Sequence, residues 1–245
     1  MKLWKLALCA TVASVGLAGA AHAEDGDSPT VVFNVGVANE YSFRGLSQTR
    51  KDIQVFGGAD VSYKILYGGI WASNVDFANG TDAEVDIYGG VKPTVGPVTL
   101  DFGGIAYLYP GAPDGPGSPH YFEFKAGASV PAGPATLGVV VFHSPEFPYD
   151  FGPATYLEGN AAVPLMDKLT LSGAVGHQWL DEDHWGIDGY TTYNIGLTYQ
   201  ITSHVSIDGR YIGNDGTADD FFTTDRDVPF NAADKFIATL KVTFP

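Results

Sequence analysis

The ten residues before the terminal proline alternate between apolar and polar side chains. From Lys235 to Phe244 the chain reads Lys-Phe-Ile-Ala-Thr-Leu-Lys-Val-Thr-Phe, and Ile237 is the exception to the alternation. Successive side chains of a β-strand point to opposite faces, so this segment predicts a ribbon with one apolar and one polar face. Because the pattern recurs along the chain, it constrains the fold more than any single residue does.

About twelve such segments of roughly ten residues follow one another between turn signals. The connections between them alternate strictly in length. The short ones are Ile65–Leu66, Pro93–Pro97, Pro131–Pro134, Pro164–Lys168 and Gln200–His204. The longer ones are Arg44–Asp52, Ala78–Asp82, Pro110–Pro119, Ser144–Pro153, Asp181–Asp188 and Gly213–Asp234. Short turns at one rim and long loops at the other are typical of a transmembrane barrel, with both termini at the short-turn rim.

The apolar residues are spread over alternate positions rather than gathered in runs. No stretch after residue 23 approaches the ~18 apolar residues that a spanning helix needs. Charged residues make up 17% of the chain, which is low for a soluble domain. A secreted β-sandwich is the alternative, but sandwich strands usually have about 5–6 residues. We therefore predict an all-β fold, a transmembrane antiparallel up-and-down β-barrel of about twelve strands.

The first 23 residues have the organisation of an export signal. Two lysines precede an apolar run over residues 6–20, and Ala21-His22-Ala23 forms an A-x-A site, so we expect cleavage after Ala23. Residues 24–245 then form the mature barrel domain. Cys9 lies inside the signal and follows Leu8, where a lipoprotein site has a small residue. We expect Cys9 to be part of the signal rather than a lipid anchor.

The charge of the chain excludes one class of partner. Without the two signal lysines, 11 basic residues stand against 28 acidic residues, a net charge of −17. With no basic patch to meet phosphate, nucleic-acid binding is disfavoured. The long loops over 181–188 and 213–234 are acidic. Our first interpretation is that these loops are solvated and repel one another. A Ca²⁺ site over 214–220 is an alternative, but its spacing does not match an EF-hand, so we predict no metal or cofactor.

Four short motifs go beyond the general pattern of a barrel. They are Tyr41-Ser-Phe-Arg-Gly-Leu-Ser-Gln48, Trp71-Ala-Ser-Asn-Val-Asp-Phe77, Glu84-Val-Asp-Ile-Tyr-Gly-Gly90 and Tyr109-Pro-Gly111. Together they resemble the TorF family of porins from Gram-negative bacteria, over about residue 31 to the C-terminus. The last strand, with its aromatic end, also resembles the segment that marks outer-membrane barrels for insertion, although Pro245 follows it. The resemblance implies an outer-membrane barrel that passes solutes, and it defines no substrate.

In a barrel the polar face of each strand points into the lumen, because a Lys or Arg side chain that faces lipid at mid-depth destabilises the barrel by about 2–4 kcal/mol. Our first interpretation of the inward-facing charges is a structural network of ion pairs. The second is a transverse electric field that selects solutes by their charge. For Arg44, Asn74 and Asp76 the alternatives are a loop anchor paired with a neighbour and a direct contact with solute. The candidate pore-lining residues are Arg44, Asp60, Asn74, Asp76, Glu84, Asp86, Asp101, Glu123, Lys125, Glu158, Asp208 and Arg210.

No catalytic constellation is visible in the sequence. His143 and Ser144 are adjacent, His177 and Ser172 have opposite parity, and no G-x-S-x-G elbow is present, so we predict no enzyme activity.

We predict instead a porin-like channel in the bacterial outer membrane for passive diffusion of small hydrophilic solutes, with cations favoured. A structural or adhesion barrel without transport is the alternative, which a plugged lumen would favour. The expected partners are outer-membrane lipid and lipopolysaccharide, the barrel-assembly machinery through the C-terminal strand, and small solutes.

Overall fold

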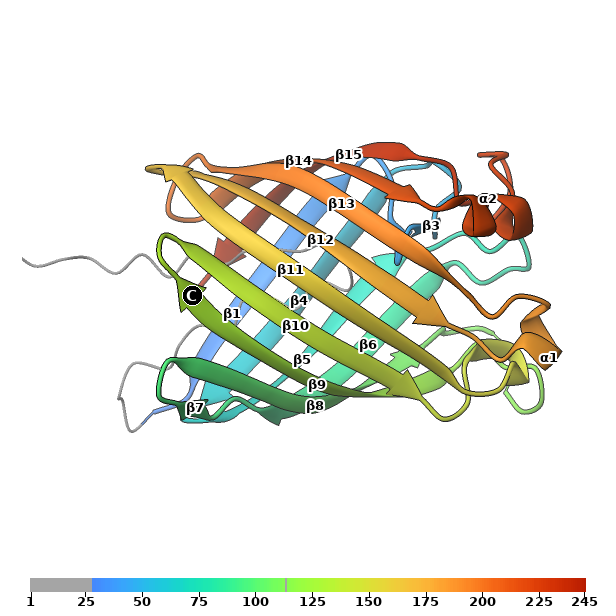
Figure 1. Ribbon diagram of the computed structural model, residues 1–245, viewed down its shortest axis with the longest axis horizontal. Coiled ribbons are helices and arrows are strands. Elements are labelled where there is room, and N and C mark those ends of the chain that lie inside the picture. Colours follow the sequence, from blue (N-terminus) through green and yellow to red (C-terminus); the bar gives the residue numbers. More distant parts are fainter. Residues whose placement is uncertain (1–27, 113) are drawn as a thin grey trace, which may run out of the picture.

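The computed structural model describes residues 28–112 and 114–245, and its strands close into a barrel (Figure 1). Its wall contains 12 antiparallel strands. They are β1 (Thr30–Ala38), β4 (Gln54–Tyr63), β5 (Leu66–Asn74), β6 (Ala83–Val91), β8 (Val98–Leu108), β9 (Tyr121–Ala132), β10 (Ala135–Ser144), β11 (Ala154–Met166), β12 (Leu169–Trp179), β13 (Gly189–Gln200), β14 (Val205–Asn214) and β15 (Lys235–Phe244).

Each strand pairs with its neighbours along the chain, and two further contacts complete the ring. β1 pairs with β15, and β6 pairs with β8 across the small extension β7 (Thr94–Val95). The predicted up-and-down barrel is therefore confirmed. The signal peptide predicted over residues 1–23, including Cys9, lies outside the described residues.

The two rims of the barrel differ as the connection lengths predict. Short turns lie at the rim that also holds the C-terminus, while the long loops carry α1 (Glu182–Trp185) and α2 (Gly216–Phe222) at the other rim (Figure 1). We call these the turn rim and the loop rim. In the described part of the chain, no helix combines the length and apolar content that a membrane crossing requires.

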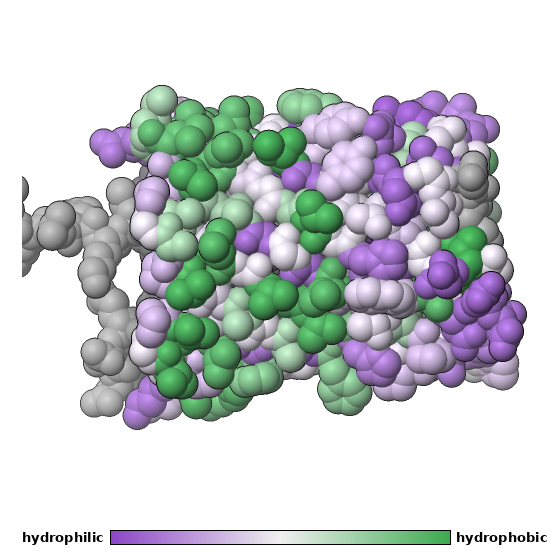
Figure 2. Space-filling model, in the orientation of Figure 1, coloured by the Kyte–Doolittle hydropathy of each residue, from purple (hydrophilic) through white to green (hydrophobic). Residues whose placement is uncertain are grey.

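The outer face of the barrel is apolar. Figure 2 shows hydrophobic residues over the part of the wall nearer the turn rim and hydrophilic residues gathered at the loop rim. Monomeric soluble proteins rarely expose apolar patches larger than a few hundred Å². Leu197 and Leu240 point outward instead of packing in a two-layer core, which excludes the sandwich alternative. The exposed apolar side chains include Phe33, Val35, Val55, Ile70, Ile87, Phe102, Phe124, Val139, Leu157, Val175, Ile195, Leu197, Ile207, Phe236 and Leu240.

Inward-facing glycines let aromatic rings from neighbouring strands lie flat against the wall. A Cβ on Gly69 would come within 2.5 Å of the Tyr88 hydroxyl, and one on Gly176 within 2.1 Å of the Tyr156 hydroxyl. Both hydroxyls then reach carboxylates on the inner wall, with Tyr88 donating to Asp60 at 2.5 Å. The space left at these glycines therefore admits the tyrosine rings and lets their hydroxyls reach polar groups of the interior.

We expect a charge on the outer face to destabilise the barrel strongly. Ile195 lies at the middle of β13 and is 55% exposed. Ile195→Arg places a charge at mid-depth of the bilayer, so the free energy of unfolding in phospholipid vesicles should fall by about 2–4 kcal/mol. Guanidinium titration followed by tryptophan fluorescence measures this. The control, Ser206→Arg, puts the same charge on the inward parity of β14 and should cost less than half as much. Equal losses would contradict the assigned orientation.

Candidate functional site in the barrel interior

A short hairpin follows β1 and folds into the lumen. It consists of β2 (Ser42–Phe43) and β3 (Leu46–Ser47), joined by Arg44 and Gly45. Both central residues have positive φ, 46° and 82°, as a type I′ turn requires. We call residues 41–48 the inner hairpin. The sequence predicted part of this stretch as a long external loop; in the structure its side chains are largely buried inside the barrel.

Arg44, at the tip of the inner hairpin, reaches the wall opposite β1. Its Nη2 lies 2.7 Å from Glu123 Oε2 on β9, and its Nη1 donates to Gln178 Oε1 on β12 at 2.8 Å. The guanidinium also lies over the rings of Tyr156, 4.5 Å from the centroid, and Phe142, 5.2 Å from the centroid. Because β9 to β12 lie across the ring from β1, the hairpin crosses the lumen.

The ion pair at the hairpin tip is almost fully removed from water, with side-chain exposures of 2% for Arg44 and 1% for Glu123. Burial by itself lowers the pKa of Arg44, but the Glu123 carboxylate more than offsets this, so the pKa lies above its usual value. Tyr107 also donates to Glu123 Oε2, at 3.0 Å. Glu123 is thus held between a cation and a phenol, and the expected pairing of Arg44 with a carboxylate is present.

The near side of the inner hairpin is held by the end of the chain. The Gly45 carbonyl accepts from Lys235 Nζ at 2.9 Å and from Asn214 Nδ2 at 3.1 Å. Ser47 pairs through its backbone with the last long loop, donating to Asn231 O and accepting from Phe230 N, both at 3.0 Å. The hairpin is therefore fixed at both walls by independent sets of contacts.

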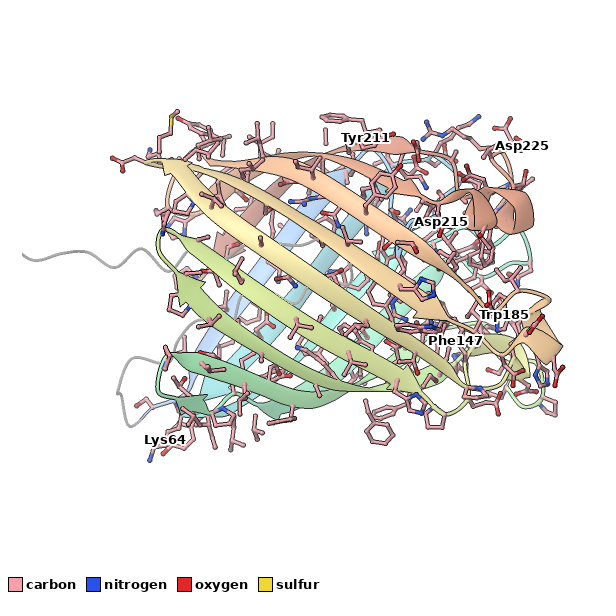
Figure 3. The ribbon with its side chains drawn as sticks, in the orientation of Figure 1. Lys64, Phe147, Trp185, Tyr211, Asp215 and Asp225 are labelled. Atoms are coloured by element: carbon pink, nitrogen blue, oxygen red, sulfur yellow. The ribbon has the colours of Figure 1, made fainter. Side chains whose placement is uncertain are left out.

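Aromatic rings fill the space between the inner hairpin and the wall formed by β5, β6 and β8. Tyr41 packs edge-on against Trp71, and Phe43 packs edge-on against Tyr107. The Tyr41 hydroxyl donates to Glu84 Oε1 at 2.8 Å. This cluster extends toward the loop rim, where the ring centroids of Phe147 and Trp185 lie 6.0 Å apart (Figure 3). Tyr211, by contrast, projects from the outer face. The loop-rim half of the interior is thus densely packed.

The turn-rim half of the interior is polar and more open. Asp101 accepts from Lys125 at 2.6 Å and from Tyr67 at 2.7 Å, and lies 3.5 Å from Lys92 Nζ. Lys92 retains a side-chain exposure of 27% and Asp101 of 16%, so water reaches these groups.

A second polar cluster lies on the wall formed by β11 to β14, on the turn-rim side of the hairpin tip. Arg210 donates to Asn194 at 2.7 Å and to Ser172 at 2.8 Å, and pairs with Asp208 at 3.2 Å. The Glu158 carboxylate accepts from Tyr156 and from Asn160, both at 3.2 Å. The wall charges of this cluster are therefore paired within the protein.

Ten of the twelve predicted pore-lining residues lie inside the barrel. Arg44 is in the inner hairpin, and the others share the inward parity of their strands: Asp60, Glu84, Asp86, Asp101, Glu123, Lys125, Glu158, Asp208 and Arg210.

Asn74 and Asp76 do not lie where the sequence predicted. Asn74 has the outward parity of Ile70, and its side chain accepts from Val55 N at 2.7 Å and donates to Ile53 O at 3.0 Å. Asp76 lies beyond the end of β5 and pairs with Arg50 at the loop rim, with side-chain exposures of 29% and 33%. Partial burial raises the pKa of Asp76, but hydrogen bonds from Arg50 and Ala78 N outweigh it and leave the pKa below its usual value.

Sequence reasoning missed most partners of Arg44. Gln178 and Tyr156 come from strands far along the chain, so no local signal identifies them. The hairpin itself had a signal: an X-Gly pair between apolar Phe43 and Leu46 is a two-residue turn pattern.

The acidic stretch after β14 serves a structural role. Asp215 caps α2 by accepting from Ala218 N, and its other oxygen accepts from Thr191 N at 2.8 Å. Among the described residues, no group of three or more His, Cys, Asp or Glu side chains is arranged to hold a metal ion.

A closed antiparallel barrel with an apolar outer face, a charged interior and long loops at one rim defines the class of outer-membrane β-barrels. Within that class, the chain belongs to the family described as "Bacterial protein of unknown function (Gcw_chp)", whose profile matches residues 22–244. That description does not carry the TorF name, so the TorF resemblance stays a prediction. A comparison with curated proteins found no match.

Solved structures of outer-membrane barrels share this fold. A KdgM porin superimposes with a TM-score of 0.58 at 5% identity, covering 88% of this chain and 99% of the porin. A KdgM porin in complex with disordered oligogalacturonate gives 0.57 at 4% identity, with the same coverage. An outer membrane channel from Pseudomonas putida F1 gives 0.54 at 10% identity, covering 90% of this chain and 98% of the channel. At such identities the likeness establishes the fold alone.

We expect loss of Arg44 to release the inner hairpin. Arg44→Ala leaves Glu123 buried beside no cation, and breaking a buried pair in this way costs about 3–5 kcal/mol. The barrel strands keep their own hydrogen bonds, so the loss should appear as local opening of residues 41–48. Native-state hydrogen exchange of the Gln48 amide, which donates to Tyr41 O at 2.8 Å, measures this opening.

Arg50→Ala is the matched control, because it removes an arginine–carboxylate pair from the same loop. That pair is partly exposed, so its loss should change the opening free energy by only about 0–1 kcal/mol. Equal effects of the two variants would contradict the role of the buried pair.

Proposed function

We propose that this protein is a narrow channel of the bacterial outer membrane through which small hydrophilic solutes diffuse passively. The observation that carries the proposal is a closed wall around a charged interior, crossed at one end by the inner hairpin. The sequence resemblance to TorF porins supports the same function. Solutes would enter the water-accessible turn-rim half freely and would be selected at the hairpin.

The distribution of charge supports a preference for cations at the hairpin. On the turn-rim side of the hairpin, four acids are balanced by four bases: Asp60, Asp101, Glu158 and Asp208 by Lys92, Lys125, Arg210 and Lys241. Around the hairpin, three carboxylates, Glu84, Asp86 and Glu123, stand against two cations, Arg44 and Lys235. An excess of carboxylates in a narrow, low-dielectric passage favours cations. The acidic loops at the loop rim add to this field at low salt.

The alternative is a structural or adhesion barrel without transport. The dense packing of the inner hairpin, with Arg44 and Glu123 nearly excluded from water, favours this second function. In either case we propose that the outer face contacts membrane lipid, that the loop rim meets lipopolysaccharide, and that β15 is read by the barrel-assembly machinery.

Catalysis is not part of the proposal. His143 and His177 lie on the outer face, where their Nδ1 atoms contact Thr155 and Thr191 at 2.9 Å and 3.0 Å. The Ser144 hydroxyl instead donates to Glu146 O at 2.6 Å. This arrangement supports no pairing of the Ser144 hydroxyl with either imidazole.

Planar-bilayer recording tests the channel. We expect the mature protein to give discrete conductance steps in KCl, with a reversal potential that favours K⁺ over Cl⁻ in a salt gradient. Replacing residues 42–47 by Gly-Gly should enlarge the steps, because nothing then crosses the lumen. Arg44→Ala should shift them in the same direction, and Arg50→Ala should leave them unchanged.

Two outcomes separate the proposals. If the intact protein is silent over many insertions while the Gly-Gly variant conducts, the hairpin is a seal, and the structural barrel is favoured over passive diffusion. If the hairpin replacement and Arg44→Ala conduct like the intact protein, the hairpin does not select solutes.

A further inference from the structure

One carboxylate beside the inner hairpin has no hydrogen-bond partner among the described residues. Asp86 is 0% exposed, and neither of its carboxylate oxygens accepts a hydrogen bond. Other acids of the same wall are all bonded: Glu84 by Tyr41, Glu123 by Tyr107 and Arg44, Asp60 by Tyr88, and Asp101 by Tyr67 and Lys125. Asp86 is thus the exception among these acids, because each of the others accepts a hydrogen bond from a tyrosine phenol.

The surroundings of Asp86 are aromatic. Its cross-strand neighbours on the inner face are Trp71 on β5 and Tyr107 on β8, both buried. The inner hairpin covers these rings, with Tyr41 on Trp71 at 5.6 Å and Phe43 on Tyr107 at 5.9 Å between centroids. The phenol hydroxyls of Tyr41 and Tyr107 are already committed to Glu84 and Glu123.

A buried carboxylate without hydrogen bonds is unfavourable unless something else compensates it. The charged groups near it do not do so, because Glu84 and Glu123 repel it and Arg44 is taken up by Glu123 and Gln178. The faces of tryptophan and tyrosine rings attract cations. Carboxylate oxygens enclosed by such rings therefore form an environment that suits a positive ligand.

We propose that Asp86 binds a monovalent cation at the level of the inner hairpin, between the rings of Trp71 and Tyr107. The inference rests on the proposed channel function and deepens it by assigning the position where a permeating cation pauses. A divalent ion is disfavoured, because Ca²⁺ takes 6–8 oxygen ligands and the described acidic side chains do not converge as a metal cage. One carboxylate, neighbouring aromatic rings and water suit K⁺ or a similar ion.

Quenching of Trp71 fluorescence by Tl⁺, a heavy K⁺ analogue, tests the site without requiring conduction. Trp179→Phe and Trp185→Phe leave Trp71 as the tryptophan of the mature chain. In detergent-refolded protein we expect saturable quenching by Tl⁺, competed by K⁺. Asp86→Asn preserves the shape of the side chain and removes its charge, so the dissociation constant should rise by about tenfold or more, equivalent to ~1.4 kcal/mol.

Asp60→Asn is the matched control, because it removes the same charge from a carboxyl that Tyr88 already bonds. This variant should keep saturable quenching within about twofold of the parent. Linear quenching of the parent, or identical saturation with Asp86→Asn, would overturn the site; the second result would mean that Asp86 is neutralised by a proton. Saturable, Asp86-dependent quenching by a protein that never conducts would leave the site standing and refute the channel.

Discussion

Closure of the sheet is the constraint on which every other feature depends. In hydrocarbon no water is present to bond an exposed strand edge, so the ladder must return to its starting strand. Here the β1–β15 and β6–β8 pairings achieve this. Once the ring of strands is closed, successive side chains point alternately out of and into the barrel, and the apolar side chains face lipid. The polar side chains are then confined together in the interior, where each charge needs a partner.

The interior meets that need with tyrosine as much as with opposite charge. Tyr41, Tyr67, Tyr88 and Tyr107 each donate to a carboxylate, and inward glycines leave room for rings such as Tyr88 to lie along the wall. A phenol donates a hydrogen bond without adding charge, so the carboxylates stay negative in sum. A lumen neutralised by lysines alone would carry no net field. The tyrosines thus satisfy the acids without neutralising them, which is the arrangement that the proposed preference for cations requires.

The sequence predicted those features that depend on alternation, and it failed where both faces of a strand look alike. The alternation of apolar and polar residues with a period of two predicts the barrel, the sorting of short and long connections, and the inward placement of Asp60 and Arg210. Asn74 was misplaced because β5 carries Tyr67 and Trp71 inward and Ile70 outward, so hydrophobicity does not distinguish its faces. The partners of Arg44 depend on which strands lie across the ring, and only the closed barrel brings them together.

The inner hairpin links the two ends of the chain across the lumen. It follows the first strand, its Gly45 carbonyl is held by Lys235 at the start of the last strand, and its Arg44 is held by the far wall. A movement confined to one side must break one set of contacts while the other persists. Arg44 and Gly45 are adjacent in the turn, so the side chain of one residue and the carbonyl of the next tie the same tip to opposite walls. Displacing the tip in either direction leaves a buried charge or a buried carbonyl without its partner, so the inner hairpin should open by losing both sets of contacts together, rather than by swinging away from one wall.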